Sequence, residues 1–277
     1  MKDTNPEKAD FTDNLAIQTM NLTRKYGLQT AVDHINLQVS YGKIFGLLGP
    51  NGAGKSTTIK MLTTILDPSS GTATVAGFNV VDEPAQVRRR IGYVPQMLSA
   101  DGALTGSENL MLSAKLFRMP RAERAARIIE ALQFMGLENS ANKLVKTYSG
   151  GMIRRLELAQ AMLHHPTILF LDEPTIGLDP MAKKLVWDRL LDLRRGYNMT
   201  VLLTTHDMEE ADQLCDELAI LHEGKVAIVG RPNDLKLTIS PTATLDDVFA
   251  HCCGVMITEG GNYRDVRQTR STVTRLG

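Results

Sequence analysis

The chain has 277 residues, of which 43% are hydrophobic and 22% charged, and its 31 Lys and Arg balance its 31 Asp and Glu. This is the composition of an ordinary globular protein, and it excludes the disordered, collagen-like, coiled-coil and disulfide-scaffold classes. A net charge of zero gives no electrostatic reason to expect nucleic acid as the main ligand, because that binding needs a clustered basic surface.

Residues 1–14 are polar, contain Pro6 and predict a frayed tail. The three cysteines have neither zinc-ligand nor disulfide-frame spacing, so we expect a reducing compartment. The sequence has no apolar run of about 18 residues, and we expect that the chain does not span a membrane by itself.

The first half of the chain predicts a β layer followed by a buried strand and a helix. LAIQTMNLT and TAVDHINLQV, between Leu15 and Val39, alternate apolar and polar residues and favour antiparallel strands. KIFGLLG, residues 43–49, is continuously apolar and leads through a Gly-rich loop into the helical stretch KSTTIKMLTTIL. Such an order is typical of a central strand in an α/β sheet.

A hairpin and the short strand IGYVPQ are predicted after Pro68, with the arginines at 88–90 as a solvated charge run. From about 97 to 165 the pattern is helical, because Thr105 and Glu108 have capping-box spacing and Gly136 follows a periodic helical run. We therefore expect a helical subdomain inserted in an α/β core.

The α/β pattern then resumes. It predicts the strand TILFLDE, a helix from Pro180 to about Arg195 closed by Gly196, the strand TVLLTTH, a further helix, and the strand pair LAILHEG and KVAIVG. Residues 236–277 predict a short C-terminal extension with a helix at LDDVF and a polar tail.

GPNGAGKST, residues 49–57, matches the phosphate-loop pattern G-x-x-x-x-G-K-[ST]. Its glycines let backbone amides turn toward a β-phosphate, Lys55 supplies a positive charge, and Ser56 can ligate Mg²⁺. A strand before the loop and a helix after it are the context that separates this pattern from a chance Gly-rich turn. The predicted nucleotide-binding residues are Gly49, Pro50, Asn51, Gly52, Ala53, Gly54, Lys55, Ser56 and Thr57.

Asp172 and Glu173 end the apolar strand TILFLDE, at the strand end where open α/β sheets bind ligands. Asp172 would hold Mg²⁺ through its water shell, and Glu173 is placed to accept a proton from an attacking water. Adjacent carboxylates are, taken alone, as often a helix cap or a salt-bridge pair. The phosphate loop favours the catalytic interpretation.

Ser149, Gly150 and Gly151 open an amphipathic helix, and their hydroxyl and amides form a second anion-binding helix start. Ser-Gly-Gly by itself is usually an ordinary N-cap. The surrounding motifs decide between these interpretations.

Over residues 15–235 the sequence resembles the nucleotide-binding subunit of an ATP-binding-cassette (ABC) transporter. The resemblance rests on seven motifs in order: Tyr26 in the aromatic A-loop place, the phosphate loop, Gln96 in the Q-loop, YSGGM ending at Met152 as the signature, ILFLDE as Walker B, IGLD ending at Asp179 as the D-loop, and His206 as the switch histidine. Tyr148, Met152 and Ile176 depart from the commonest residues at their places, which puts fine dimer contacts in doubt.

The YSGGM form, PTIGLDP and TLDDVF look like the drug and antibiotic exporter branch, of the daunorubicin-resistance type, whose permease is of the ABC-2 class. These variants also occur among exporters of lipids and polysaccharides. The fold implied is α/β: a P-loop NTPase cassette with an antiparallel β layer, a RecA-like core and an inserted helical subdomain.

The resemblance implies ATP and Mg²⁺ as cofactors, with Tyr26 stacking on adenine. It assigns catalysis to Glu173, His206, Gln96 and Lys55, metal binding to Ser56, Gln96 and Asp172, and contact with a second ATP to Ser149, Gly150, Gly151, Met152 and Asp179. From the residues alone, Tyr26 is as readily an ordinary strand aromatic, and Gln96 and His206 are as readily caps.

The implied partners are an integral membrane permease and a second copy of the chain in a head-to-tail dimer, with no nucleic acid. The implied location is peripheral, at the cytoplasmic face of the membrane. One alternative is a soluble ABC ATPase acting on ribosomes or DNA, and another is a non-hydrolytic regulatory module, which would be expected to lack Lys55 or Glu173.

Overall fold

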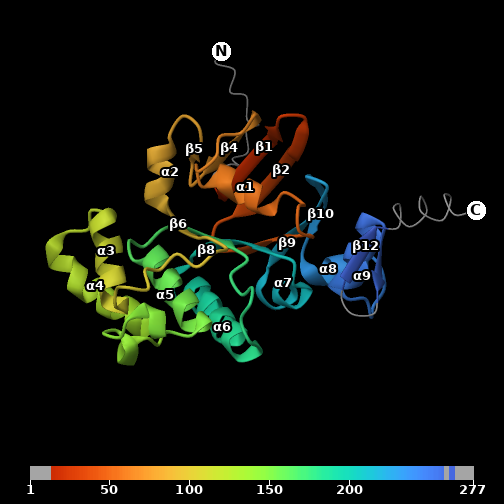
Figure 1. Cartoon of the computed structure of the whole chain (residues 1–277). Coiled ribbons are helices and arrows are strands. Elements are labelled where there is room, and N and C mark those ends of the chain that lie inside the picture. The colour runs from red at the N-terminus through yellow and green to blue at the C-terminus, as the bar shows by residue number, and fades with distance from the viewer. Residues whose placement is uncertain (1–13, 259–261, 266–277) are drawn as a thin grey trace, which may run out of the picture.

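The computed structural model describes residues 14–258 and 262–265. A four-stranded antiparallel sheet in the order β2-β1-β4-β5 lies over one side of the molecule, at the top of Figure 1. Its strands are β1 (Leu15–Tyr26), β2 (Gln29–Ser40), β4 (Ser70–Val75) and β5 (Phe78–Asn79). The predicted antiparallel layer and its hairpin are thus confirmed.

The second sheet has six strands in the order β10-β9-β3-β8-β7-β6, and β9, β3, β8, β7 and β6 run parallel. The strands are β3 (Ile44–Leu48), β6 (Ile91–Val94), β7 (Ile168–Asp172), β8 (Thr200–Thr205), β9 (Glu217–His222) and β10 (Lys225–Gly230). Every residue of β3, β7 and β8 is buried, as expected for strands covered on both faces.

Side-chain alternation in the central strands divides the core into two clusters, one on each face of the sheet. Phe45 and Leu47 of β3 pack with the antiparallel layer and with α1 (Lys55–Leu62). Ile44 and Leu48 of the same strand pack on the other face, with the helices that follow β6. The two-residue period of a strand thus places α1 and the helices that follow β6 on opposite sides of the sheet.

The helices between β6 and β7 are α3 (Gly106–Leu116), α4 (Arg121–Phe134) and α5 (Gly150–Met162), and α3 and α4 stand out to one side of the molecule (Figure 1). Thr105 and Glu108 form the predicted capping box at the start of α3. Met135 is the C-cap of α4 and Gly136, with φ 63°, follows it, so the predicted helix stop is also confirmed.

The predicted end of α6 (Pro180–Tyr197) at Gly196 is wrong. Gly196 continues the helix, and the left-handed residue that ends it is Asn198, with φ 48°. Asn tolerates this conformation because its short polar side chain can hydrogen-bond locally.

Two short helices were not predicted, α2 (Pro84–Arg90) and α8 (Pro232–Leu237). Each has Pro in its first turn, where the missing N–H costs no hydrogen bond. The arginines at 88–90 occupy the last turn of α2 and are exposed, as expected for a solvated charge run.

The C-terminal extension contains α9 (Leu245–Cys253), which includes the predicted LDDVF helix, and a hairpin of β11 (Val255–Thr258) and β12 (Asn262–Asp265). The hairpin replaces part of the predicted polar tail; the rest, and the N-terminal tail up to residue 13, lie outside the described residues. The remaining helix, α7 (Met208–Leu214), follows β8. Among the described helices, none has the length and apolar character needed to cross a membrane.

Candidate functional site

The phosphate loop joins the buried strand β3 to α1, and its glycines are required by space and backbone conformation. A Cβ on Gly49 would collide with the carbonyl oxygen of Leu221. Gly54 has φ 99°, and a Cβ there would lie 2.6 Å from the carbonyl oxygen of Ala31. The sequence folds into this tight turn because glycine is the residue that adopts such backbone conformations without strain.

Lys55 begins α1 and is only 4% exposed. Its ammonium donates hydrogen bonds to the carbonyl oxygens of Gly49 at 2.7 Å and Pro50 at 3.2 Å. Burial lowers the pKa of Lys55, while the nearby carboxylates of Glu173 and Asp172 act in the opposite direction. The loop therefore holds a nearly buried cation at its centre.

Asp172 lies at the end of β7, where its Oδ1 accepts hydrogen bonds from Ser56 Oγ at 2.9 Å and from Thr204 Oγ1 at 2.6 Å. A carboxylate beside a hydroxyl, both near a phosphate loop, is an all-oxygen donor set of the kind that Mg²⁺ prefers. The two residues predicted from separate motifs, Ser56 and Asp172, are thus direct neighbours.

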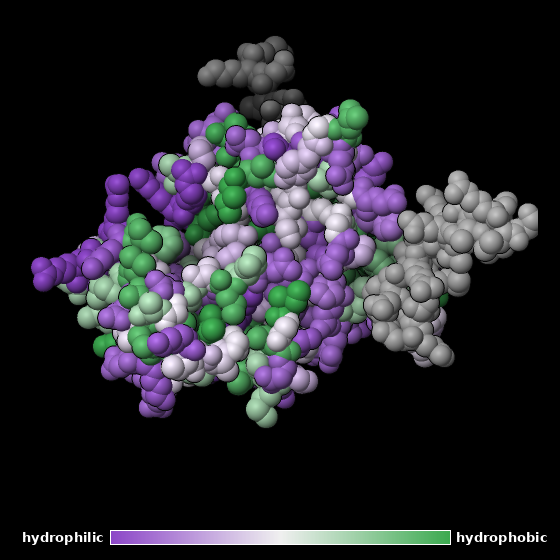
Figure 2. All heavy atoms as spheres, in the orientation of Figure 1, coloured by the Kyte–Doolittle hydropathy of each residue, from purple (hydrophilic) through white to green (hydrophobic). Residues whose placement is uncertain are grey.

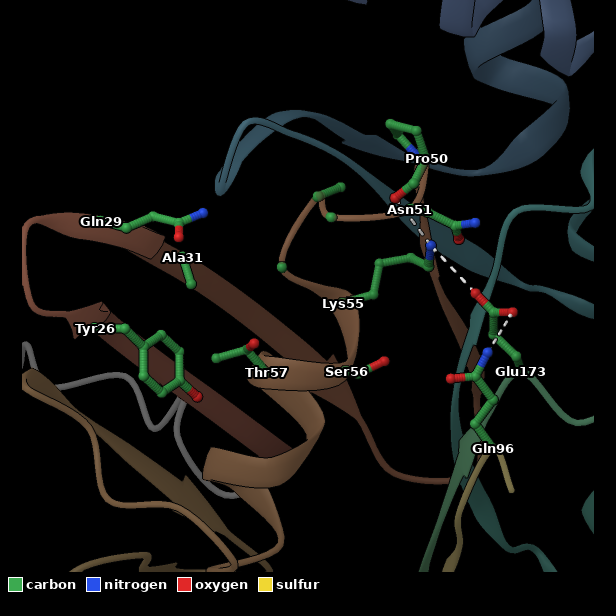
Figure 3. Close-up of a pocket in the computed structure, with 13 residues that line it drawn as sticks. Tyr26, Gln29, Ala31, Pro50, Asn51, Lys55, Ser56, Thr57, Gln96 and Glu173 are labelled. Atoms are coloured by element: carbon green, nitrogen blue, oxygen red, sulfur yellow. Dashed lines mark hydrogen bonds and ion pairs between the residues drawn. The ribbon is translucent and has the colours of Figure 1, made fainter. Parts of the chain in front are cut away.

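Glu173 contacts three other predicted site residues, although it is only 5% exposed. Its carboxylate lies 3.4 Å from Lys55 Nζ, 3.3 Å from Gln96 Nε2 and 3.2 Å from His206 Nδ1. Figure 3 shows Lys55 and Gln96 pointing toward Glu173 from opposite sides. Three predicted catalytic residues therefore meet at one carboxylate.

The backbone of Glu173 has φ 49°, a left-handed conformation that is uncommon for a residue with a long side chain. Its N–H donates to Thr204 Oγ1 at 3.0 Å and to the Thr204 carbonyl oxygen at 3.2 Å. Thr204 therefore fixes both acidic residues, Asp172 through its hydroxyl and Glu173 through its backbone.

A pocket of ≈ 470 Å³ extends from Tyr26 to Glu173 (Figure 3), within the usual size range of small-molecule sites. Residues 50–57 line it together with Tyr26, Gln29, Ala31, Gln96 and Glu173. Tyr26 is 47% exposed, and the Arg24 guanidinium lies 4.8 Å from its ring centroid. The pocket thus has an aromatic end and an anion-binding end.

The signature residues form a separate part of the site. Ser149 caps α5 and accepts a hydrogen bond from the Met152 N–H at 3.3 Å, and both Ser149 and Gly150 are exposed. Within the described part of the chain, the lining of the phosphate-loop pocket includes none of the residues from 149 to 152, nor Asp179 or His206.

The signature and the D-loop contact one another at the starts of two helices. Asp179 caps α6 and accepts from the Ala182 N–H at 2.9 Å. A Cβ on Gly151 would lie 2.8 Å from the Cβ of Ala182, so a side chain at 151 would push the two helices apart. The exposed Ser149 hydroxyl therefore lies beside the tightly packed starts of α5 and α6.

A smaller pocket of ≈ 90 Å³ shares Glu173 with the first and is also lined by His206, Asp207 and Glu210, among others. Asp207 caps α7 and lies 2.7 Å from Lys183 Nζ. Glu210 is 1% exposed and accepts hydrogen bonds from Thr175 at 2.7 Å and Trp187 at 3.0 Å.

The sequence interpretation missed Thr204 and Glu210. Thr204 is one of two threonines at the end of the apolar run TVLLTTH, which was interpreted only as a strand. Glu210 is buried within a helix that the sequence shows as acidic and polar, and nothing in that pattern marks one glutamate as internal.

Three comparisons with known proteins agree on one family. The family model described as ABC transporter matches residues 32–176. The daunorubicin/doxorubicin resistance ATP-binding protein DrrA of Streptomyces peucetius is 46% identical over 224 residues, which are 81% of this chain and 68% of that protein. Nod factor export ATP-binding protein I of Cupriavidus metallidurans is 42% identical over 219 residues, 79% of this chain and 72% of that protein.

Solved structures show the same fold. An ATP-binding subunit of an ABC transporter superimposes with a TM-score of 0.76 at 29% identity, covering 86% of this chain and 99% of that one. A dimeric ATP-binding cassette in a post-hydrolysis state, bound to ADP and Pi, gives a TM-score of 0.69 at 28% identity, covering 78% of this chain and 98% of that one.

Proposed function

Because this chain belongs to the ABC transporter family, as an ATP-binding subunit similar to exporter ATPases, we propose that it hydrolyses ATP to drive export through a separate membrane permease. The observation that carries the proposal is the meeting of Lys55, Gln96 and His206 at the Glu173 carboxylate, beside the pocket of the phosphate loop.

ATP binds with its phosphates on the loop, where the amides of residues 49–57, the start of α1 and the Lys55 ammonium provide positive potential. At the other end of the pocket, the adenine base lies beside the ring of Tyr26. The aromatic face of Tyr26 stabilises the adenine by stacking. Ser56 and Asp172, which are hydrogen-bonded to each other, would hold Mg²⁺, with Gln96 as a further ligand. When bound, Mg²⁺ offsets the negative charge of the β- and γ-phosphates.

Hydrolysis uses Glu173 as the proton acceptor for the attacking water. Lys55 and the loop amides stabilise charge on the phosphates, and His206 contacts the γ-phosphate from the other side of Glu173. The side-chain amide of Gln96 donates a hydrogen bond to Glu173 and so orients the carboxylate that receives the proton. The products are ADP and phosphate.

The complete site is formed by two chains. Ser149, Gly150, Gly151, Met152 and Asp179 lie apart from the pocket of their own chain, and they contact the ATP held by the phosphate loop of a second copy. A head-to-tail dimer brings this about, and a cassette that this chain resembles was solved as a dimer. Two ATP molecules are bound per dimer.

The permease contacts the helical part of the chain. Hydrophobic side chains reach the surface there in separate patches among hydrophilic ones (Figure 2), and large exposed examples are Leu112 and Leu116 of α3 and Ile129 of α4. This contact places the chain at the cytoplasmic face of the membrane. The names of its relatives, which refer to daunorubicin/doxorubicin resistance and to Nod factor export, favour an exported drug or a Nod factor as the cargo.

Steady-state release of phosphate from ATP by the purified chain tests the enzymatic proposal. Lys55→Ala should abolish hydrolysis, whereas Lys60→Ala should leave it intact, because Lys60 is an exposed lysine of the same helix. Both variants are checked by circular dichroism melts. Hydrolysis by a folded Lys55→Ala protein at the parent rate would overturn the assignment of the phosphate loop.

Purification of the chain from detergent-solubilised membranes tests the transport proposal. Recovery of one integral membrane protein that changes the rate of ATP hydrolysis on reconstitution is expected. Recovery of ribosomes or DNA-bound proteins in its place would support the soluble ATPase alternative.

A further inference from the structure

The segment of residues 95–101, which carries Gln96, is held by a buried arginine of the signature helix. Arg154 lies in the first half of α5 and is 2% exposed. Its guanidinium donates one hydrogen bond to the Pro95 carbonyl oxygen at 2.7 Å and one to the Gln96 carbonyl oxygen at 2.8 Å. Two adjacent backbone carbonyls are thus fixed by one planar group.

Glu157, three residues later on the same helix and 3% exposed, completes this arrangement. It accepts a hydrogen bond from Arg154 at 2.9 Å, another from the Ser99 hydroxyl at 3.1 Å, and a third from the Ser99 backbone N–H. The carboxylate therefore pairs with the arginine and binds the loop at the same time.

A second helix holds the far end of the segment. The Asn109 side chain of α3 is 1% exposed, donates to the Asp101 carbonyl oxygen at 3.0 Å, and accepts from the Asp101 N–H at 2.9 Å. The segment is thus bound at both ends by side chains from the helical part of the chain. Toward the sheet core, the Gln96 amide reaches the Glu173 carboxylate.

Stability alone does not explain a buried ion pair at this place. Two well-packed apolar side chains of similar volume are often as stabilising as a buried pair of charges, because the charges lose their hydration. A guanidinium provides something that they do not, a rigid fork of donors that fits two acceptors at once. The Arg154–Glu157 pair therefore serves to fix the geometry of residues 95–101.

We propose that Arg154 and Glu157 are positioning residues that fix Gln96 to the signature helix, so that a displacement of α5 changes the contact between Gln96 and Glu173. Ser149 caps the same helix less than two turns before Arg154. Contact with ATP at the Ser149 end would then be transmitted through a single rigid helix to the catalytic carboxylate. This inference rests on the proposed ATPase function.

A kinetic cycle tests the proposal, using the double variant Arg154→Met/Glu157→Leu, which removes both charges and retains most of the volume. We expect the double substitution to lower kcat by about 10-fold in the parent, as a misplaced catalytic contact does. In a Gln96→Ala background the same substitution should lower kcat less than about 2-fold, because its target is already absent. Losses of equal size in both backgrounds would overturn the proposal.

Arg155→Met is the matched control, since Arg155 lies on the same helix but donates to the Met135 carbonyl oxygen at 2.7 Å and away from the Gln96 segment. Any effect that it has on kcat should be the same with and without Gln96. If the double variant does not fold, Arg154→Lys takes its place, because it retains the charge beside Glu157 but loses the planar fork.

Amide hydrogen exchange provides a measurement that does not depend on turnover. In the double variant the amides of residues 96–101 should exchange at least about 10-fold faster, while those of β7 and β8 keep their protection. Unchanged exchange in residues 96–101 would refute the proposal that Arg154 and Glu157 hold this segment. Absence of hydrolysis in the parent would refute the proposed function separately, because the exchange experiment would still decide whether Arg154 and Glu157 hold the loop.

Discussion

Lys55 Nζ lies 3.4 Å from Glu173 Oε1, and the two side chains are 4% and 5% exposed. The cation expected to bind phosphate and the carboxylate expected to accept a proton are therefore a buried ion pair. Removing one partner of such a pair leaves an uncompensated charge, which is strongly destabilising. Substitutions that remove one partner, such as Lys55→Ala, therefore need a stability measurement beside the activity measurement.

Glu173→Gln retains the shape of the side chain and removes its basicity. We expect ATP affinity to be kept, because the loop and Lys55 are intact, and turnover to fall by about 10²-fold or more. Binding of a fluorescent ATP analogue and single-turnover phosphate release measure the two effects. Glu223→Gln, at a glutamate that is 71% exposed, is the control. A Glu173→Gln protein that turns over like the parent would exclude a role as proton acceptor.

Mixing two inactive variants tests whether Ser149 acts on the partner's ATP. Ser149→Arg, which blocks the anion site with bulk, and Lys55→Ala should each abolish hydrolysis alone. A mixed dimer has one site with both motifs intact, so mixing should restore part of the activity.

The mixing experiment requires that each variant dimerises and that a single site turns over in a positive control. Under those conditions, complete lack of rescue would favour a site contained within one chain.

Gly151→Ala should destabilise the fold by about 1–3 kcal/mol, because the new Cβ would lie 2.8 Å from the Cβ of Ala182. Ala182→Gly removes that contact, so the loss caused by Gly151→Ala should be smaller in its presence. Gly150→Ala is the matched control, since its Cβ meets Leu178 at an ordinary 3.5 Å. Denaturant melts of the parent, the three single variants and the Gly151→Ala/Ala182→Gly double variant measure these losses. If Gly151→Ala lowered the stability equally in the parent and in the Ala182→Gly background, close packing between positions 151 and 182 would be contradicted.

Glu210 gives a pH dependence with a definite sign. Burial raises the pKa of Glu210 above its ordinary value of 4.5, against hydrogen bonds from Thr205, Thr175 and Trp187. The folded protein therefore binds this proton more tightly than the unfolded chain, and the associated stability is complete below pH 4.5 and is lost as the pH rises through the folded pKa.

Glu210→Gln should remove that loss, so the stability of the variant relative to the parent should increase as the pH rises from 4.5 to neutral. Urea melts along this pH series measure the difference. Glu209→Gln, at the exposed neighbouring residue, should follow the parent at every pH. A Glu210→Gln difference that does not vary with pH would contradict the argument.

Local patterns were sufficient to predict the phosphate loop, the buried strands and the capping box of α3. Each depends on residues close in sequence, such as the glycines around Lys55 or the spacing of Thr105 and Glu108. The end of α6 could not be placed, because Gly and Asn are both residues that commonly end helices in the left-handed conformation, and Gly196 and Asn198 lie two positions apart.

The parts of the site that depend on contacts distant in sequence could not be predicted. Thr204 binds Asp172 across neighbouring strands, and Arg154 binds the carbonyls of Pro95 and Gln96 from another helix. Arg154 has no distinguishing mark in a sequence where the next residue is also arginine. The roles assigned to Tyr26, Gln96 and His206 stay predictions.

The left-handed backbone of Glu173 places conformational strain at the residue proposed as the proton acceptor. A residue with a Cβ pays about 1–2 kcal/mol for this conformation, and glycine does not. Replacing Glu173 by Gly would relieve this strain but would leave the buried Lys55 ammonium without its partner, which costs more. Engineers of a hardier variant should hold position 173 constant and seek added stability elsewhere in the chain.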